Sequence, residues 1–360
     1  MSSPTAHETT QEAMTLDWTW FFSPGTYVLA LPNWRSPRLY LPAQRHVRRW
    51  QDSSFYPASR LLARLYRQVL RSKAAVGLTE VRRVQSDGWL LGEFVQDVLP
   101  QARSAVALVG TPGPAQKITV RVLGERGEAL GYLKYAEKEA ARRRLEQERR
   151  VLEGLPVGVG PEMLKFGPFG GGEALLTTAM VGKRVPATTG LGEEVGDLLA
   201  SLVVSSPVTL EAHPWVAPAR ERLGPDLDPW LELLAAKRWP IVVQHGDFAP
   251  WNMLWRPDGT LGAIDWEYGV LESFPHLDLA YCLLQVLALI QRQAPEKATE
   301  FACGYMARQP RLELNREEAR TLVRLAAYDA YMKSREDGQP DDAELQVWRR
   351  IVWETRRQRS

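Results

Sequence analysis

The chain has little cysteine and no long apolar run, and both shortages narrow the class of protein to which it can belong. Only Cys282 and Cys303 occur among 360 residues, which argues against a disulfide scaffold and is typical of a reducing compartment. No stretch reaches the roughly 18 uninterrupted apolar residues of a membrane span. The first residues also lack the basic start and apolar core of a signal peptide. We therefore expect a cytoplasmic protein.

Internal repeats and low-complexity tracts are also missing, which argues against solenoids and fibrous proteins. With 45% hydrophobic residues, a chain of this length has enough material for two or three globular domains. Residues 1–15 are polar and aperiodic, and we expect them to be disordered.

Net charge is only +2, but it is unevenly distributed. Residues 35–83 carry a net charge of +10, which leaves −8 for the remainder. Within them, a helix predicted over residues 59–74 has two faces. Its leucine and valine face is Leu61, Leu62, Leu65 and Val69, and its arginine face is Arg60, Arg64, Arg67 and Arg71. This basic segment is predicted to bind an anionic acceptor or an acidic membrane surface, unless it is a solvated face or pairs with the acidic remainder. Nucleic acid is disfavoured because no nucleic-acid-binding motif accompanies the charge.

The character of the sequence changes twice. Residues 16–100 form a basic accessory segment, in which proline-ended strands accompany the helix. Residues 101–182 contain three short β-type runs, a long charged helix and two strands around a glycine turn, which predicts a β-rich lobe with one helix. Helices dominate residues 183–360.

Five features with the chemistry of phosphoryl transfer follow one another along the chain. Lys134 lies near the end of a predicted strand, and Glu148 lies in the following helix. The motif H-G-D-x-x-x-x-N then presents Asp247 and Asn252 after an apolar strand, and Asp265 ends a later strand. Kinases need a lysine held by a glutamate to grip the nucleotide phosphates, an aspartate as base, and an asparagine and a second aspartate to hold Mg²⁺.

The spacing of the last three features favours a common site. Between Asn252 and Asp265 the sequence "RPDGT" predicts a tight turn, so a hairpin would place the two side chains next to each other. Two oxygen ligands from neighbouring strands suit a hard cation that keeps several waters. The alternative for Glu148 is an ordinary surface pairing, because arginines surround it in the sequence.

These motifs together resemble the aminoglycoside phosphotransferase and choline kinase superfamily. "HGDFAPWN" is similar to its catalytic loop, "IDWE" to its metal-binding element and "PHLDLA" to the start of its next helix; "YLKY" and the "E-x-x-x-L-x-x-L" pattern at Glu148 are similar to its nucleotide lobe. The resemblance implies an α+β, two-lobed protein-kinase-like fold over about residues 105–335, with the accessory segment before it. It implies ATP or GTP and Mg²⁺ as cofactors.

The same resemblance assigns roles to individual residues. It implies Asp247 as catalytic base and Asn252 and Asp265 as metal ligands, and Lys134, Glu148, Thr178 and Met180 as nucleotide-binding residues, the last two in a hinge whose backbone meets the purine. Asp278 would support the catalytic loop, and His245 is interpreted as a second structural support.

Two departures from protein kinases affect the expected acceptor. The loop "GTPGPAQK" lacks a G-x-G-x-x-G pattern, so it is either a phosphate lid or an ordinary hairpin loop. Gly246 stands where protein kinases have arginine, as in the small-molecule branch of the superfamily. We predict a kinase that phosphorylates a hydroxyl of an aminoglycoside, a sugar or an amino alcohol. The alternatives are a catalytically weak nucleotide-binding scaffold and a kinase acting on a glycolipid or a protein.

An aminoglycoside would need an acidic pocket, and choline would need an aromatic cage. The sequence offers candidates for both, the tryptophans Trp215, Trp230, Trp239 and Trp251 and the acids Asp226, Asp228 and Glu232.

Overall fold

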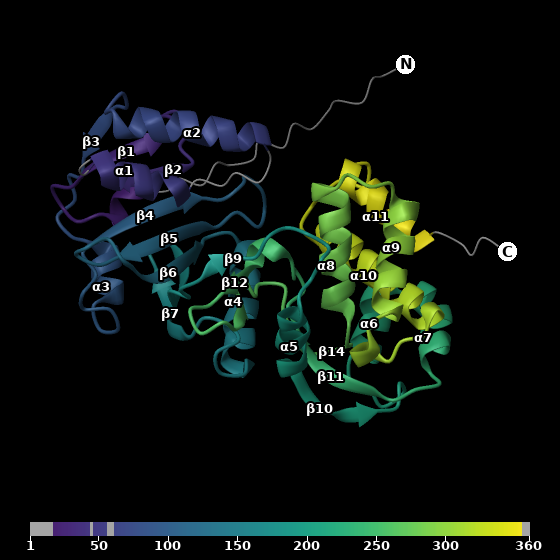
Figure 1. Cartoon of the computed structure of the whole chain (residues 1–360). Coiled ribbons are helices and arrows are strands. Elements are labelled where there is room, and N and C mark those ends of the chain that lie inside the picture. Colours follow the sequence, from purple (N-terminus) through teal and green to yellow (C-terminus); the bar gives the residue numbers. More distant parts are fainter. Residues whose placement is uncertain (1–16, 44–45, 56–60, 355–360) are drawn as a thin grey trace, which may run out of the picture. The chain divides into compact units, whose positions relative to one another are not determined.

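The computed structural model describes residues 17–43, 46–55 and 61–354 (Figure 1). The chain divides into two compact units. We call the first, residues 1–145 with 164–179, the sheet unit, and the second, residues 146–163 with 180–360, the helical unit. A β-sheet unit and a mainly helical unit confirm the predicted α+β class.

The sheet unit is built on eight strands in the order β3-β1-β2-β4-β5-β6-β8-β7. The strands are β1 (Tyr27–Leu31), β2 (Leu39–Pro42), β3 (Val81–Arg83), β4 (Ser104–Val109), β5 (Ile118–Leu123), β6 (Ala129–Ala136), β7 (Met163–Phe169) and β8 (Gly172–Thr178). Its helices are α1 (His46–Asp52), α2 (Leu61–Ala75) and α3 (Leu90–Val95), and α4 (Glu139–Gly154) continues into the helical unit. Alternate residues of β5 and β6 are buried, as expected for strands with one face on a core.

The basic accessory segment extends this sheet. β2 is antiparallel to β4, with Leu39 opposite Leu108 and Tyr40 opposite Ala107. β1 lies between β2 and β3, so residues 27–42 and 81–83 join the strands of the segment 101–182 in one hydrogen-bonded layer. An eight-stranded sheet therefore replaces the shorter sheet that residues 101–182 alone would form.

Helix α2 turns a different face to the sheet from the one the sequence predicts. Leu70 and Ala74 are buried in a cluster with leucines of β1 and β2, whereas Leu65 and Val69 are 57% and 52% exposed. Arg71 is half-buried: its guanidinium lies 4.0 Å from the Trp50 ring centroid and donates to the Trp50 carbonyl. The leucine face predicted from the sequence is therefore not the buried face of the helix. The small side chain of Ala74 lets the opposite side of the helix approach the sheet. Arg60 and the side chains of Leu61, Leu62 and Arg64 lie outside the described residues.

The helical unit packs its helices around one large apolar cluster. They are α5 (Glu193–Ser201), α6 (Val216–Leu223), α7 (Asp228–Leu234), α8 (Leu277–Gln285), α9 (Pro295–Ala307), α10 (Arg316–Glu336) and α11 (Glu344–Glu354). Two three-stranded sheets, β10-β11-β14 and β13-β12-β9, complete it. Their strands are β9 (Lys183–Arg184), β10 (Val203–Val208), β11 (Trp239–Gln244), β12 (Met253–Trp255), β13 (Leu261–Ala263) and β14 (Val270–Ser273).

Three of the four candidate cage tryptophans belong to this core. Trp215, Trp230 and Trp239 are at most 7% exposed, and Trp215 and Trp239 pack against Phe274. They stabilise the unit and do not form an aromatic cage. Trp251, within the "HGDFAPWN" motif, is the one that stays partly exposed.

No helix in the described part of the chain combines the length and the apolar character needed to cross a membrane.

Candidate active site

The catalytic motif begins where strand β11 ends, and its glycine is required by the backbone. Gly246 has a φ of +79°, a conformation that side chains other than glycine rarely adopt. A Cβ built on it would lie 2.2 Å from the carbonyl oxygen of Tyr268. An arginine, as found in protein kinases, therefore cannot occupy this position without moving the chain around Tyr268.

Asp278, in the first turn of α8, supports the loop. Its two carboxylate oxygens accept hydrogen bonds from the backbone N–H groups of His245 (2.6 Å) and Gly246 (2.9 Å). Burial raises the pKa of the Asp278 carboxyl to about 6, although these two hydrogen bonds oppose the rise. The two bonds hold the turn that presents Asp247, and they are the structural argument for the support expected of Asp278.

His245 is fully buried beneath the loop and connects it to the metal-binding element. Its Nδ1 accepts from the backbone N–H of Asp247 (3.2 Å), so the ring proton resides on Nε2, which donates to the carbonyl of Ile264 (2.9 Å). Both ring nitrogens are therefore used in structural bonds. This geometry supports a structural role for His245 and leaves no nitrogen for proton transfer.

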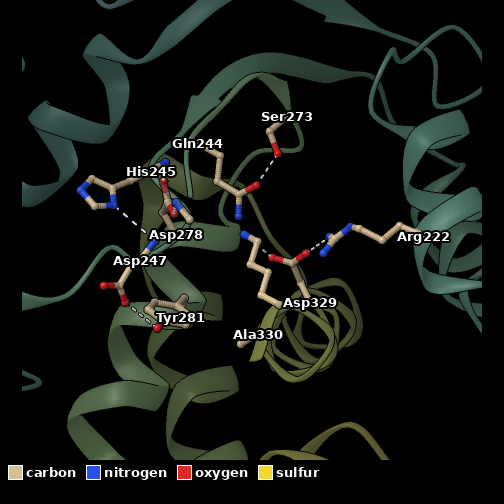
Figure 2. Close-up of polar contacts among 12 residues, drawn as sticks. Arg222, Gln244, His245, Asp247, Ser273, Asp278, Tyr281, Asp329 and Ala330 are labelled. Carbon is tan, nitrogen blue, oxygen red and sulfur yellow. Dashed lines mark hydrogen bonds and ion pairs between the residues drawn. The ribbon is translucent and has the colours of Figure 1, made fainter. Parts of the chain in front are cut away.

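Asp247 is held through both of its carboxylate oxygens (Figure 2). Tyr281 on α8 donates to Oδ1 at 2.6 Å, and the Asn252 amide donates to Oδ2 at 3.0 Å. Burial raises the pKa of the Asp247 carboxyl; the hydrogen bond from Tyr281 opposes that rise, and the charge of Asp265 adds to it. A partly buried carboxylate with a raised pKa and a fixed orientation has the properties of a general base.

The predicted hairpin brings Asp265 to Asn252. β12 pairs with β13 so that Met253 faces Ala263, and the Ile264 N–H donates to the Asn252 carbonyl at 2.9 Å. The strand ends at Ala263, and Asp265 has a φ of +72°. This strained, left-handed conformation at a residue with a carboxylate is characteristic of functional sites.

Asn252 and Asp265 supply two oxygen atoms, which fits a magnesium ion. They are too few to hold a metal whose ligands all come from the protein. The amide nitrogen of Asn252 is bonded to Asp247, which leaves its Oδ1 as the atom for a cation. In the described residues, no group of three or more His, Cys, Asp or Glu side chains could hold a metal. One carboxylate and one amide oxygen are the set that Mg²⁺ uses when water and phosphate oxygens fill its other positions.

The nucleotide-binding residues predicted in the sheet unit lie in the neighbouring strands β6 and β8. Lys134 is part of β6, opposite Thr119 of β5 and Leu175 of β8. Thr178 ends β8 opposite Gly131, and the chain passes from one unit to the other between Ala179 and Met180. The predicted hinge thus coincides with one of the three points at which the chain passes between the units.

Glu148 lies on α4 in the helical unit and is 2% exposed. Elsewhere on this helix, Arg149 and Arg150 both bond to Glu146, and Arg149 also bonds to Glu153. The burial of Glu148 contradicts the alternative interpretation of this side chain as a surface residue. Burying a carboxylate is costly unless its charge is used, which favours a specific role.

The loop between β4 and β5, residues 110–117, is closed by hydrogen bonds at its base. The Gly110 N–H donates to the Lys117 carbonyl (2.8 Å), and the Gln116 side chain donates to the Gly110 carbonyl (3.2 Å). Lys138 also donates to the Gly113 carbonyl (3.2 Å). These contacts describe a hairpin loop, and its use as a phosphate lid stays a prediction.

A partly buried ionic cluster, formed by Asp329 and Lys333 of α10 and Arg222 of α6, lies near Asp247 (Figure 2). Asp329 pairs with Arg222 and, at 2.8 Å, with Lys333. Burial opposes ionisation of Asp329, but the two cations outweigh it and lower its pKa to about 2. The charge of Lys333 also favours the ionised forms of Asp247 and Asp278. Lys333 therefore contributes positive potential to these carboxylates, whereas the charge of Asp329 raises the pKa of Asp278.

Sequence reasoning missed Tyr281 and the ionic cluster. Tyr281 follows Asp278 by three residues on a predicted helix, so the two side chains share a face, and this spacing is a signal that could have been used. Lys333 and Asp329 show only the common i, i+4 pairing of a helix surface. Their burial depends on the packing of α10.

Comparison with protein families agrees with this geometry. Residues 205–302 match the model of the phosphotransferase enzyme family. The matched residues include Asp247, Asn252, Asp265 and Asp278. The predicted resemblance and the predicted enzyme class, a phosphotransferase, are confirmed.

A search of curated protein sequences finds no match to this phosphotransferase. Among solved structures, it is similar to an ethanolamine kinase from Plasmodium vivax, with 11% identity and a TM-score of 0.48, over 74% of this chain and 86% of that one. It is also similar to a choline kinase from Streptococcus pneumoniae, with 15% identity and a TM-score of 0.44, over 72% and 94% of the two chains.

Proposed function

We propose that this phosphotransferase moves the γ-phosphate of ATP or GTP to a hydroxyl of a small molecule, with Asp247 as the general base. The observation that carries the proposal is the double hydrogen bonding of the Asp247 carboxylate by Tyr281 and Asn252, in a loop supported by Asp278. Such a carboxylate can accept the proton of an attacking hydroxyl while keeping its orientation.

The remaining residues are proposed to bind different parts of the nucleotide and its metal ion. Asn252 and Asp265 would hold Mg²⁺, which when bound neutralises charge on the phosphates. Lys134 would bind the phosphates, with Glu148 as its partner, and the backbone from Thr178 to Met180 would bind the base. The buried position of Glu148 and the chain connection at Met180 support these roles.

The acceptor is proposed to be an aminoglycoside, a sugar or an amino alcohol. The requirement for glycine at position 246 supports a small-molecule kinase over a protein kinase, since the arginine of protein kinases does not fit there. A scaffold without activity would not need Asn252 to be hydrogen-bonded to Asp247 and joined to Asp265 by a hairpin.

The decisive experiment measures phosphate transfer from ATP to kanamycin, choline, ethanolamine and a panel of sugars in the presence of Mg²⁺. Asp247→Asn should lower the turnover number about 10²–10⁴-fold, the usual contribution of a positioned base, while ATP affinity stays unchanged. Asp258→Asn is the matched control, because Asp258 lies in the exposed turn of the same hairpin. Full activity of Asp247→Asn would exclude Asp247 as the base.

The accessory segment is proposed to bind an acidic membrane surface. Leu65, Tyr66 and Val69 are exposed on α2, and Lys73 is exposed on the same helix. Apolar side chains flanked by basic ones are the composition of surfaces that bind anionic lipid. A polyanionic acceptor would use the basic residues but not the apolar ones. Replacing Leu65 and Val69 therefore distinguishes binding to a membrane from binding to such an acceptor.

A cytoplasmic location is proposed because Cys282 and Cys303 are both free and buried. Fractionation of cells that produce the protein tests this.

A further inference from the structure

We propose that Tyr281 is a positioning residue that fixes the orientation of the catalytic carboxylate. The inference rests on the proposed function of Asp247. It starts from the shortest contact of that side chain, the 2.6 Å hydrogen bond from the Tyr281 hydroxyl to Oδ1.

The two oxygens of Asp247 have different partners, and both are needed to fix the carboxylate. Asn252 donates to Oδ2, but the same amide also donates to the backbone carbonyl of Asp247, and its oxygen is assigned to the metal. Asn252 alone therefore leaves Oδ1 unrestrained. Rotation of the carboxylate about its Cβ–Cγ bond moves both oxygens, so the short bond from Tyr281 opposes that rotation together with the bond from Asn252.

Helix α8 carries the tyrosine and the loop support on one face. Asp278 bonds to the backbone of the loop and Tyr281, three residues later, bonds to its side chain. Loop and carboxylate are thus placed by a single rigid element, which is how a catalytic group is held within a fraction of an ångström. Figure 2 shows Tyr281 and Asp247 pointing toward each other from α8 and the loop.

Tyr281 remains a hydrogen-bond donor throughout the working pH range. Burial raises the pKa of its phenol well above 10, and the negative charge of Asp247 raises it further. The ring lines a small cavity with Ala326, Ala330 and Arg349 from α10 and α11. A neutral donor restrains the carboxylate without giving up its own proton. The oxygen lone pairs that Tyr281 and Asn252 do not use remain available to accept the proton of a hydroxyl.

The test compares Tyr281→Phe with Tyr328→Phe. Tyr328 is the control, because its hydroxyl also donates a short hydrogen bond in the same unit, to the backbone carbonyl of Leu223 at 2.7 Å. A hydrogen bond to a charged group is worth enough that Tyr281→Phe should lower kcat about 10- to 100-fold, with the KM for ATP unchanged. Tyr328→Phe should change stability to a similar extent and leave kcat as it is. Equal kcat values in both variants would overturn the proposal.

A double variant separates positioning from a general loss of structure. In an Asp247→Asn background, where no base remains to be oriented, Tyr281→Phe should have almost no further effect on kcat. Multiplying effects of the two changes would show that Tyr281 acts elsewhere.

A crystal structure of Tyr281→Phe supplies a readout that does not depend on turnover. The Asp247 carboxylate should be rotated or present in two orientations, and an unchanged single orientation would overturn the inference. If the wild-type protein transfers phosphate neither to the acceptor panel nor to water, the proposed function fails, while this structural outcome still decides the role of Tyr281.

Discussion

The two units bury different kinds of side chain. In the described part of the sheet unit, the one acidic residue among the buried groups is Asp52, which pairs with Arg121 at 2.8 Å. In the described part of the helical unit four carboxylates are buried, Glu148, Asp278, Glu318 and Asp329. Glu318 and Asp329 are paired with cations, and Asp278 accepts two backbone hydrogen bonds. Because a buried charge costs free energy unless it is paired, the helical unit needs more of these compensating contacts than the sheet unit does.

Large apolar side chains are exposed in both units, but in the sheet unit most of them come from one stretch of the chain. Within residues 65–81, the exposed large hydrophobic side chains are Leu65, Tyr66, Val69, Val76, Leu78 and Val81. In the described part of the helical unit the exposed ones, such as Val157, Val203 and Phe301, are far apart in the sequence. The stretch in the sheet unit is therefore the one that we propose to meet a partner.

The largest expected effect is the loss of stabilisation by ATP and Mg²⁺, and it distinguishes the proposed metal ligand Asp265 from the proposed phosphate-binding residue Lys134. At ATP and Mg²⁺ concentrations about 1,000-fold above Kd, binding should stabilise the wild-type protein by about 4 kcal/mol. Asp265→Ala should remove the part of this stabilisation that depends on Mg²⁺, and Lys134→Ala should weaken ATP binding with or without the metal. Thermal melting with ATP alone and with ATP and Mg²⁺ measures both. An unchanged Mg²⁺-dependent shift in Asp265→Ala would place the metal elsewhere.

A pH experiment tests the buried carboxylate of the helical unit. Burial raises the pKa of Asp278 to about 6, so the folded protein binds this proton more tightly than the unfolded chain does. Its contribution to stability is therefore complete only below the pKa of the unfolded chain, near pH 3, and is lost as the pH rises through 6. Relative to Asp278→Asn, the free energy of unfolding of the wild type should fall by about 2 kcal/mol between pH 4 and pH 7.

Chemical unfolding at several pH values measures this difference, in which the other titrating groups cancel. Asp258→Asn is the control, because the hydrogen bonds from Thr260 lower the pKa of the exposed Asp258 and its dependence should have the opposite sign. If the difference in free energy of unfolding between the wild type and Asp278→Asn does not vary with pH, then the pKa of Asp278 is the same in the folded protein as in the unfolded chain.

The smallest effect on stability is expected for α2. Leu65→Ser and Val69→Ser change exposed side chains and should alter the free energy of unfolding by no more than about 0.5 kcal/mol. Leu70→Ala, on the buried side of the same helix, should cost about 2–5 kcal/mol. In a flotation assay with phosphatidylserine vesicles, the two serine variants should bind less than the wild type. Undiminished binding would mean that the basic residues alone hold the anionic partner.

The active-site hairpin could be predicted because the information is local. The apolar strand before His245, the turn between Asn252 and Asp265 and the spacing within "HGDFAPWN" are short-range patterns, and the structure joins Met253 to Ala263 and Ile264 to Asn252 as the turn implies. The strands of the sheet unit were also predictable, because period-2 alternation and turn residues recur along the chain.

Two things could not be predicted: which side of a helix is buried, and which residues distant in the sequence come into contact. Leucines at helical spacing indicate an apolar face on α2, but which side meets the sheet depends on the small Ala74 and on the ring of Trp50. In the same way, the sequence places an aspartate and a tyrosine on one face of α8, and only the packing of that helix brings them to a loop more than thirty residues away. The sequence by itself determined the order and the chemistry of the catalytic groups, because these follow from motifs and short-range spacing. The tertiary structure decided how the Asp247 carboxylate is held and which apolar side chains remain exposed, because those depend on the surfaces that fit together when the helices pack.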